Sequence, residues 1–245
     1  MEELVPIIMI GVVPIFLIFF LFYRNNRTVL AGFLFAWLFL PIQTYEIVGL
    51  PDYNKITATV LGIGIGILLL DIRRIFRFRP HWADLPMLIW CFVPVAASVS
   101  NGLGVYDGLS ESLDQVISWG VPWFIGRLYF KSWSDMRSMA LGLIIAGILY
   151  LPLLLFEMRM SPQLHNLVYG FHQHKFEQTM RFGGWRPMVF MNHGLMVAFM
   201  VASIAIITSW TWYAGTFRTI FKVPTWIWAI VFILLTVFIL SLIHI

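Results

Sequence analysis

The sequence predicts an all-α fold: a polytopic transmembrane helix bundle of about eight spans, with one long outer loop that contains short amphipathic helices. Three observations predict it. Of the 245 residues, 60% are hydrophobic and 11% are charged, with a mean hydropathy of +0.85, and a soluble domain needs more polar surface than that to cover its core. Most of the chain divides into apolar runs whose lengths approach the roughly 20 residues that cross a bilayer. Lys and Arg gather in alternate loops between these runs, as in membrane proteins.

Eight apolar runs follow one another along a single predicted membrane domain, residues 1–245. They cover residues 4–23, 28–50, 56–70, 85–99, 109–130, 136–156, 188–210 and 225–242. The third and fourth are short or interrupted by Gly or Pro, and the fifth is the least apolar because Glu111, Asp114 and Gln115 lie in its first turns. The first run follows two glutamates rather than basic residues, so we expect a membrane helix there and not a cleaved signal peptide. The eighth ends without a flanking charge, which predicts a fragment that lacks C-terminal helices.

Basic residues follow every odd-numbered run. Around the connections that follow the first, third, fifth and seventh runs lie Arg24, Arg27, Arg73, Arg74, Arg77, Arg79, Arg127, Lys131, Arg137, Arg218 and Lys222. The loop after the second run has only Lys55, and residues 101–108 contain no Lys or Arg. Cytoplasmic loops carry the excess of Lys and Arg. We therefore predict that the loops after the odd-numbered runs are cytoplasmic and that the N-terminus lies outside. Topology therefore accounts for the sequence pI of about 9.4, and nucleic acid is not an expected partner.

One long loop, residues 157–187, breaks this pattern. It is predicted to lie on the outer side, yet it carries four cations: Arg159, Lys175, Arg181 and Arg186. Cations kept on the outer face against the sorting rule indicate an anionic ligand there. Two alternatives stay open, because the arginines can also pair with Glu157 or Glu177, or bind lipid headgroups.

Short helices are predicted within this loop. Ser161 is a candidate N-cap with Pro162 at the first helical position, and Gly170 is a stop signal. Between them Leu164, Leu167 and Val168 fall on one face, which predicts a short amphipathic helix on the membrane surface. A second helical piece is expected over residues 173–180.

The segment Arg181-Phe-Gly-Gly-Trp-Arg186 is the sharpest local motif of the loop. Gly183 and Gly184 permit a tight turn and a close approach of the backbone to a ligand. Arg181 and Arg186 can converge on that turn, and guanidinium groups form bidentate hydrogen bonds with phosphate oxygens. The motif therefore predicts a phosphate-binding turn.

Ionisable groups near the outer ends of the sixth and seventh runs are further candidates. His193 is expected just inside the seventh helix, where a histidine can exchange a proton near neutral pH, with Asn192 as an orienting partner. A helix-packing histidine is the alternative. Glu157 and Arg159 close the sixth run, either as a salt bridge that anchors the loop or with Glu157 as a spare carboxylate in the site.

A metal site is not predicted. The pair His172 and His174 lies near His165 and Glu177, but no third and fourth ligand is set by spacing, so a solvated polar loop is expected. The single cysteine, Cys91, lies within an apolar run, where a packing role is expected.

The motifs of the outer loop resemble those of the O-antigen ligase and O-antigen polymerase superfamily, which are polytopic membrane glycosyltransferases. The resemblance rests on a Glu-terminated helix before a long outer loop, on the Arg-x-Gly-Gly-x-Arg-Pro turn at residues 181–187, and on Asn192-His193-Gly194 leading into the next helix. It covers the whole chain in architecture and about forty residues in motif. The family has a further functional outer loop, which would lie beyond Ile245.

This resemblance implies a substrate and a location. The substrate would be a glycan on undecaprenyl diphosphate, transferred to a glycan or lipid acceptor at the outer leaflet of the bacterial inner membrane, with residues 157–187 in the periplasm. Arg181 and Arg186 would bind and neutralise the leaving diphosphate, and His193 or Glu157 would position or deprotonate the acceptor hydroxyl. The other predicted substrate-binding residues are Arg159, Lys175, Gly183, Gly184 and Asn192. No metal or other cofactor is implied.

Two other functions are compatible with the sequence. A transporter or flippase for lipid-linked or anionic solutes would place polar groups on broken helices near the middle of the bilayer, and the glycines at positions 62, 64 and 66 would suit such a helix. A non-catalytic scaffold of a polysaccharide-export system would tolerate neutral replacements of Arg181, Arg186 and His193.

Overall fold

The computed structural model describes residues 3–47, 51–173, 179–181 and 184–244. About 74% of the chain is helical and there is almost no sheet, which confirms the all-α prediction. The helices are α1 (Leu4–Phe22), α2 (Asn26–Phe39), α3 (Lys55–Leu70), α4 (Arg73–Phe76), η1 (Trp82–Asp84), α5 (Leu85–Ser100), α6 (Val105–Gln115), η2 (Val116–Gly120), α7 (Val121–Tyr129), α8 (Trp133–Met160), α9 (Leu164–Tyr169), α10 (Gly194–Tyr213) and α11 (Thr225–His244). The strands form two small hairpins, β1 (Met180–Arg181) with β2 (Gly184–Trp185) and β3 (Thr219–Ile220) with β4 (Val223–Pro224).

Four helices of the described chain are long and apolar enough to cross a membrane. They span Leu4–Phe22, Trp82–Ser100, Trp133–Met160 and Gly194–Tyr213. Shorter apolar helices cover Asn26–Phe39, Lys55–Leu70 and Thr225–Ile239. The chain is therefore a helical membrane protein, and each of the eight apolar runs contains helix.

Two of the predicted helix boundaries are wrong. The second run was expected to stay helical to residue 50, but α2 ends at Phe39, because Leu40 precedes a proline and such a residue disfavours the helical region. The seventh run was expected to be helical from Met188, but α10 begins at Gly194. The residues before it form a buried loop, described below.

The chain divides into two compact units. One comprises residues 6–36 and 43–135, and we call it the N-terminal unit. The other comprises residues 1–5, 37–42 and 136–245, and we call it the C-terminal unit.

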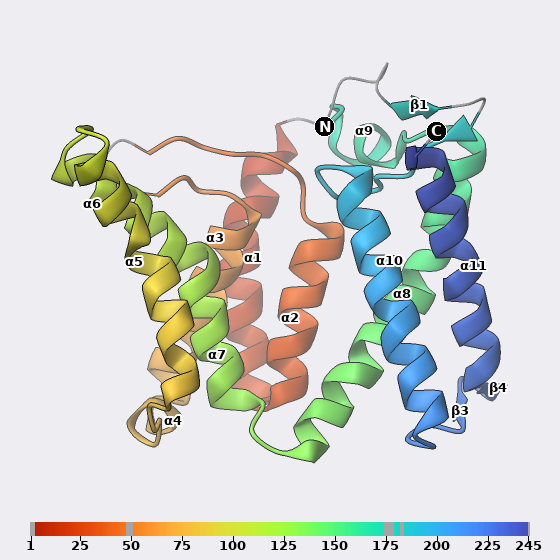
Figure 1. Cartoon of the computed structure of the whole chain (residues 1–245), viewed down its shortest axis with the longest axis horizontal. Helices are drawn as coiled ribbons and strands as arrows, with labels where there is room; N and C mark the ends of the chain where they lie inside the picture. Colours follow the sequence, from red (N-terminus) through yellow and green to blue (C-terminus); the bar gives the residue numbers. More distant parts are fainter. Residues whose placement is uncertain (1–2, 48–50, 174–178, 182–183, 245) are drawn as a thin grey trace. The chain divides into compact units, whose positions relative to one another are not determined.

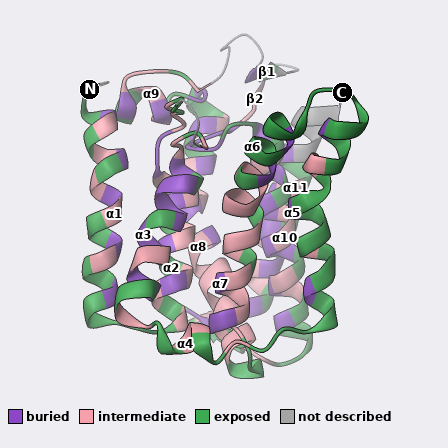
Figure 2. Cartoon of the chain, turned by 90° about the vertical axis from the view of Figure 1, so that its left-hand side faces the viewer, coloured by how far each residue is buried: buried purple, intermediate pink, exposed green. Residues whose placement is uncertain are grey.

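Glycines bring the helices of the N-terminal unit into close contact. Gly62 and Gly66 of α3 lie four residues apart. A Cβ at Gly62 would come within 2.8 Å of Phe16 on α1, and a Cβ at Gly66 would come within 3.0 Å of Phe20 on the same helix. Small residues at this spacing let membrane helices approach closely. Many of the buried residues of this unit lie on α3, and Figure 2 colours buried residues purple. The outer side of α1 instead exposes large apolar side chains such as Ile7 and Ile10, as expected of a helix that faces lipid.

The π-helical turn η2 connects α6 and α7 and packs against α5. Gly120, at its end, leaves room for the sulfur of Cys91, which would lie 3.0 Å from a Cβ at that position. Cys91 is buried, so the predicted packing role is confirmed.

Helices α8, α10 and α11 form the body of the C-terminal unit, with α10 and α11 side by side (Figure 1). Gly147 of α8 allows a close approach of these helices, because a Cβ there would come within 2.8 Å of Ile204 on α10 and 3.0 Å of Phe232 on α11. Near one end of this unit, the C-terminus of α8, helix α9, the β1–β2 hairpin and the N-terminus of α10 come together (Figure 1). Most of the predicted site residues lie there.

Candidate functional site

The buried carboxylate of Glu157 organises this end of the C-terminal unit. Glu157 lies in the last turn of α8 with 0% of its surface exposed. Its Oε1 accepts a hydrogen bond from the backbone N–H of Leu164 at 3.1 Å, and its Oε2 accepts from the N–H groups of Met188 at 2.8 Å and Val189 at 2.7 Å. One side chain thus joins three segments of the chain: α8, α9 and the loop before α10.

Glu157 replaces Ser161 as the cap of the short helix. The predicted N-cap at Ser161 is wrong: Ser161 has a φ of 86°, and Gln163 precedes α9 without a side-chain hydrogen bond to the helix. The first N–H of α9, that of Leu164, donates instead to the carboxylate of Glu157, which lies in the last turn of α8. The predicted stop is confirmed, because Gly170 has a φ of 89° and its N–H bonds to the carbonyl of Asn166.

Arg159 does not pair with Glu157 among the residues that the structure describes. Residues two positions apart on a helix do not face each other, and Glu157 points into the core while Arg159 is exposed. Within the described residues, the Glu157 carboxylate accepts its hydrogen bonds from backbone donors. The predicted salt bridge is therefore wrong, and Arg159 stays an exposed cation at the end of α8.

The loop before α10 is buried and has an unusual backbone. Residues 187–191 are buried, and Val189 has a φ of 52°, a conformation that β-branched residues rarely adopt. This backbone turns two successive N–H groups toward the Glu157 carboxylate, in the manner of an anion-binding nest. Tyr150 of α8 extends the arrangement, since its hydroxyl oxygen lies 3.2 Å from the N–H of Phe190. The amide of Gln173 donates to the carbonyls of Val189 at 2.9 Å and Met191 at 3.3 Å.

Tyr150 and Gln173 are positioning residues that sequence reasoning missed. Tyr150 lies inside an apolar run, where nothing distinguishes it from an interfacial tyrosine. Gln173 lies in a polar loop among other polar residues. Glycine and proline near residue 187 indicate that the chain turns there, but they do not indicate which side chains bind the backbone of that turn.

His165 serves packing in this structure. Only 1% of its surface is exposed. The N–H of Ile42 lies 3.1 Å from its Nε2, and its Nδ1 lies 2.8 Å from the carbonyl oxygen of Phe171. Because Nε2 accepts a hydrogen bond, Nδ1 carries the proton and the ring is neutral. The ring of Tyr169 lies 5.0 Å away.

Tyr169 completes this aromatic cluster. Its hydroxyl donates to the carbonyl of Phe39, and its ring packs edge-on against Phe190 at 5.6 Å. Burial raises the pKa of Tyr169 to about 12, because the phenolate would lose its hydration. The cluster ties α9 to the end of α2 and to the buried loop.

The arginine motif spans the antiparallel strands β1 and β2. Arg181 on β1 pairs with Gly184 on β2, and Met180 pairs with Trp185. The N–H of Arg186 continues the ladder with a bond of 3.0 Å to the carbonyl of Thr179. The connecting residues, Phe182 and Gly183, lie outside the described residues, as do Lys175, Glu177 and most of the predicted second helical piece. Met180, at the end of that piece, lies in a strand and not in a helix.

Arg186 lies across the N-terminus of α10. A Cβ at Gly194, the first residue of α10, would overlap the Nε of Arg186 and lie 2.6 Å from its Cγ. Glycine is therefore required for this close approach. The residue before it, His193, is the N-cap of α10, with extended backbone at φ −142° and ψ 145°. His193 was expected just inside the helix, and the structure places it at the cap instead.

The structure thus brings part of the predicted site together. Arg186 lies against Gly194, which directly follows the exposed residues Asn192 and His193 in the chain, while Gly184 belongs to the adjoining hairpin. Glu157 is buried in the core and holds the backbone of Met188 and Val189, in the loop between Arg186 and His193. Arg159 lies at the end of α8 on the surface.

Comparisons with known proteins add nothing to this geometry: no protein-family model matches the chain, and neither do curated proteins or solved structures.

Proposed function

We propose that this chain is the membrane part of a glycan polymerase or ligase, a glycosyltransferase that uses a saccharide on undecaprenyl diphosphate at the outer leaflet of the bacterial inner membrane. The observation that carries the proposal is the packing of Arg186 on Gly194. It places the side chain of Arg186, which carries a permanently charged guanidinium group, against the residue that follows His193, and His193 is an exposed residue that can exchange a proton. The motif resemblance described above adds the substrate class.

The proposed reaction needs two kinds of group. The acceptor hydroxyl oxygen attacks the anomeric carbon of the lipid-linked sugar, a new glycosidic bond forms, and the bond from that carbon to the diphosphate oxygen breaks. The diphosphate leaves with the bonding electrons, and the guanidinium groups of Arg186 and Arg181 stabilise its charge. His193 takes the proton of the acceptor hydroxyl. Asn192, Gly184 and Arg159 are the proposed further contacts to substrate, together with Lys175 and Gly183.

Glu157 enters this proposal as a positioning residue. Its carboxylate is fully buried and accepts three backbone hydrogen bonds, so it holds the loop that connects Arg186 to His193. A general base has to reach the substrate, and His193 is the more exposed of the two groups.

The proposed topology has eight spans, an outer N-terminus and a periplasmic 157–187 loop. Two observations support it. Helix is present in each of the eight apolar runs. In the N-terminal unit, the loops after α1, α3 and α7 meet at one end, because Asn25, Arg74 and Lys131 line the same cavity. Alternation of basic loops requires that these three lie on one side.

The shape of α3 favours this function over a transporter or flippase. A transporter is expected to interrupt a helix near its binding site, whereas α3 is continuous from Lys55 to Leu70. Two of its three glycines, Gly62 and Gly66, receive the rings of Phe16 and Phe20.

Complementation tests the proposed function. Cells that lack the gene would receive Arg181→Ala, Arg186→Lys or His193→Ala, and envelope glycan would be compared on gels at equal membrane levels of protein. Arg218→Lys, in the loop at the other end of α10, is the matched control for Arg186→Lys. We expect loss of polymer or of glycan transfer in the first three and a normal pattern in the control. Normal glycan in all three would refute the enzyme and favour a scaffold.

A further inference from the structure

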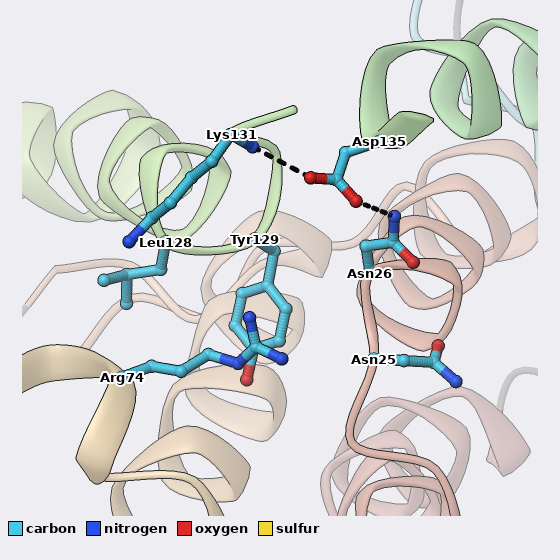
Figure 3. Close-up of a pocket in the computed structure, with 7 residues that line it drawn as sticks. All are labelled: Asn25, Asn26, Arg74, Leu128, Tyr129, Lys131 and Asp135. Atoms are coloured by element: carbon cyan, nitrogen blue, oxygen red, sulfur yellow. Dashed lines mark hydrogen bonds between the residues drawn. The ribbon is translucent and has the colours of Figure 1, made fainter. Parts of the chain in front are cut away.

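A cavity in the N-terminal unit lies among the basic loops and has no part in the reaction proposed above. Its volume is about 160 Å³, the space of about five water molecules in the liquid. Asn25 and Asn26 at the start of α2, Arg74 of α4, and Tyr129, Lys131 and Asp135 around the α7–α8 connection line it (Figure 3).

Arg74 is held in one orientation at this cavity. Its Nε donates to Asp71 Oδ2 at 2.6 Å, and its guanidinium carbon lies 4.4 Å from the centre of the Tyr129 ring. Figure 3 shows the guanidinium group against the face of that ring. The bond to Asp71 uses only Nε, and within the described part of the chain neither terminal Nη group has a hydrogen-bond partner. Arg74 therefore presents an immobilised pair of charged donors, the geometry that suits two oxygens of one anion.

The two carboxylates near the cavity are already occupied. Asp71 Oδ2 accepts from Arg74 and also from the Tyr129 hydroxyl at 2.8 Å. Asp135 accepts from the N–H groups of Lys131 and Ser132, from the Ser132 hydroxyl and from the amide of Asn26. Donors from the protein thus offset the negative charge that would otherwise repel an anion.

Further donors face the same space. The ammonium group of Lys131 has no ion-pair partner among the residues of known placement. Asn25 caps α2, since its Oδ1 accepts from the N–H of Thr28 at 3.0 Å, and this leaves its amide N–H₂ as a donor. The N-terminus of the 14-residue helix α2 adds the positive end of its dipole.

Two exposed aromatic residues are close in sequence to residues that line the cavity. Trp133, between Lys131 and Asp135, is 91% exposed, and Tyr23, two residues before Asn25, is 61% exposed. Tryptophan and tyrosine of this kind gather at the level of lipid headgroups, and basic pockets between helices at that level bind anionic headgroups.

We propose that this cavity is a binding site for a phosphate group, and that the phosphate is that of an anionic phospholipid headgroup. The Nη groups of Arg74 bind two phosphate oxygens, Lys131 and Asn25 donate to the others, and the acyl chains extend along the apolar faces of the helices. The site lies among the basic loops of the N-terminal unit and contains none of the residues assigned to glycan transfer.

Lipid titration of the purified full chain tests this site. The midpoint temperature of unfolding would be followed in mixed micelles while phosphatidylglycerol, phosphatidylcholine or inorganic phosphate is added. We expect phosphatidylglycerol to raise it saturably and phosphatidylcholine not to raise it. Lys131→Gln and Arg74→Lys should weaken the apparent affinity about tenfold, because each loses a charge-assisted hydrogen bond to the phosphate. Arg79→Gln, an exposed change of equal charge outside the cavity, is the control and should match the wild type.

Each outcome decides the proposal. Equal affinities for Lys131→Gln and Arg79→Gln would show that phosphatidylglycerol acts through general charge, and the site would be refuted. No rise with either phosphate-containing anion would refute it as well. A rise with inorganic phosphate alone, sensitive to Lys131→Gln, would keep the phosphate site and assign it to free phosphate. Lys131 is exposed and its side chain packs no core, so this variant carries the test even if Arg74→Lys fails to fold.

Discussion

The carboxylate of Glu157 lies 2.8 Å from the backbone nitrogen of Met188, 31 residues further along the chain. The same oxygen accepts from Val189 at 2.7 Å. Burial of an acidic side chain costs free energy unless the side chain is hydrogen-bonded. Here backbone N–H groups supply the hydrogen bonds. This contact fixes the loop that carries Arg186 and His193, so it controls the candidate site without needing to touch a substrate.

Glu157→Gln is expected to destabilise the C-terminal unit by on the order of 1–3 kcal/mol. The amide keeps the shape of the side chain, but one of its ends carries N–H₂ and cannot accept from the backbone donors that face it. The unfolding midpoint in detergent would fall. Arg159→Gln, two residues later and exposed, should leave the midpoint unchanged. If Glu157→Gln were as stable as the control, the hydrogen bonds from Glu157 to the backbone of residues 188 and 189 would not stabilise this unit.

Gly194→Ala is expected to displace Arg186 and to abolish glycan transfer. The new methyl group would overlap the Nε of Arg186 and lie 2.6 Å from its Cγ, so the guanidinium group has to leave the start of α10. Overlap of this kind also costs about 1–3 kcal/mol of stability. Gly126→Ala is the control, since nothing lies within 4 Å of a Cβ there. Wild-type glycan from Gly194→Ala on the same gels would remove Arg186 from the site.

Gly62→Ala is expected to lower stability, whereas Gly64→Ala two residues away should not. A Cβ at Gly62 would lie 2.8 Å from the Phe16 ring, and nothing lies within 4 Å at Gly64. Both positions are in the interior of α3, so the gain in helix propensity of up to about 1 kcal/mol is common to both. The difference between their unfolding midpoints therefore measures the α1–α3 contact. Equal midpoints would mean that the two helices do not depend on this approach.

Alkaline pH is expected to destabilise the wild type more than Tyr169→Phe. Burial raises the pKa of Tyr169 from 10.0 to about 12, so the folded protein holds the phenol proton more tightly than the unfolded chain does. The stabilising effect is complete below pH 10 and is lost as pH rises from 10 through 12, by linkage. Over that range the stability advantage of the wild type over Tyr169→Phe should shrink by on the order of 2 kcal/mol. A pH-independent difference between the two would place Tyr169 in water.

Single-cysteine labelling tests the proposed orientation. Cys91 is buried and would be replaced by Ser, and new cysteines would replace Arg159 or Arg79, both of which are exposed. A maleimide that cannot cross the membrane should label position 159 in intact spheroplasts and position 79 only after permeabilisation. The reverse pattern would invert the topology and place the arginine hairpin in the cytoplasm.

Periodicity and composition were enough to locate the helices. Runs of apolar residues predict where helix lies because an unpaired backbone polar group is very costly in lipid, so an apolar chain there has to be helical. This reasoning located α1, α3, α5, α8 and α11 closely. It failed at residues 40–47 and 188–193, which belong to predicted membrane runs but are not helical. In the second case the backbone groups find partners in Glu157, Tyr150 and Gln173, which come from other segments.

Local turn chemistry was also readable, within limits. Gly170 predicted a helix end, and the structure confirms it, because such a cap depends mainly on the backbone conformation of neighbouring residues. Ser161 shows the limit of such reasoning. Its sequence context is that of a helix cap, but a carboxylate four residues earlier supplies the acceptor.

The sequence by itself therefore determined that this is a helical membrane protein, where its helices lie, and where its basic loops and arginine turn occur. Only the tertiary structure decided that Glu157 points inward to bind the backbone of residues 188 and 189, that Arg186 lies on Gly194, and that Arg74, Lys131 and Asn25 share one cavity. The physical reason is the range of the interactions. Apolar runs and turns are set by residues a few positions apart, whereas these contacts join residues from 8 to more than 100 positions apart, and no local pattern encodes which donor meets which acceptor.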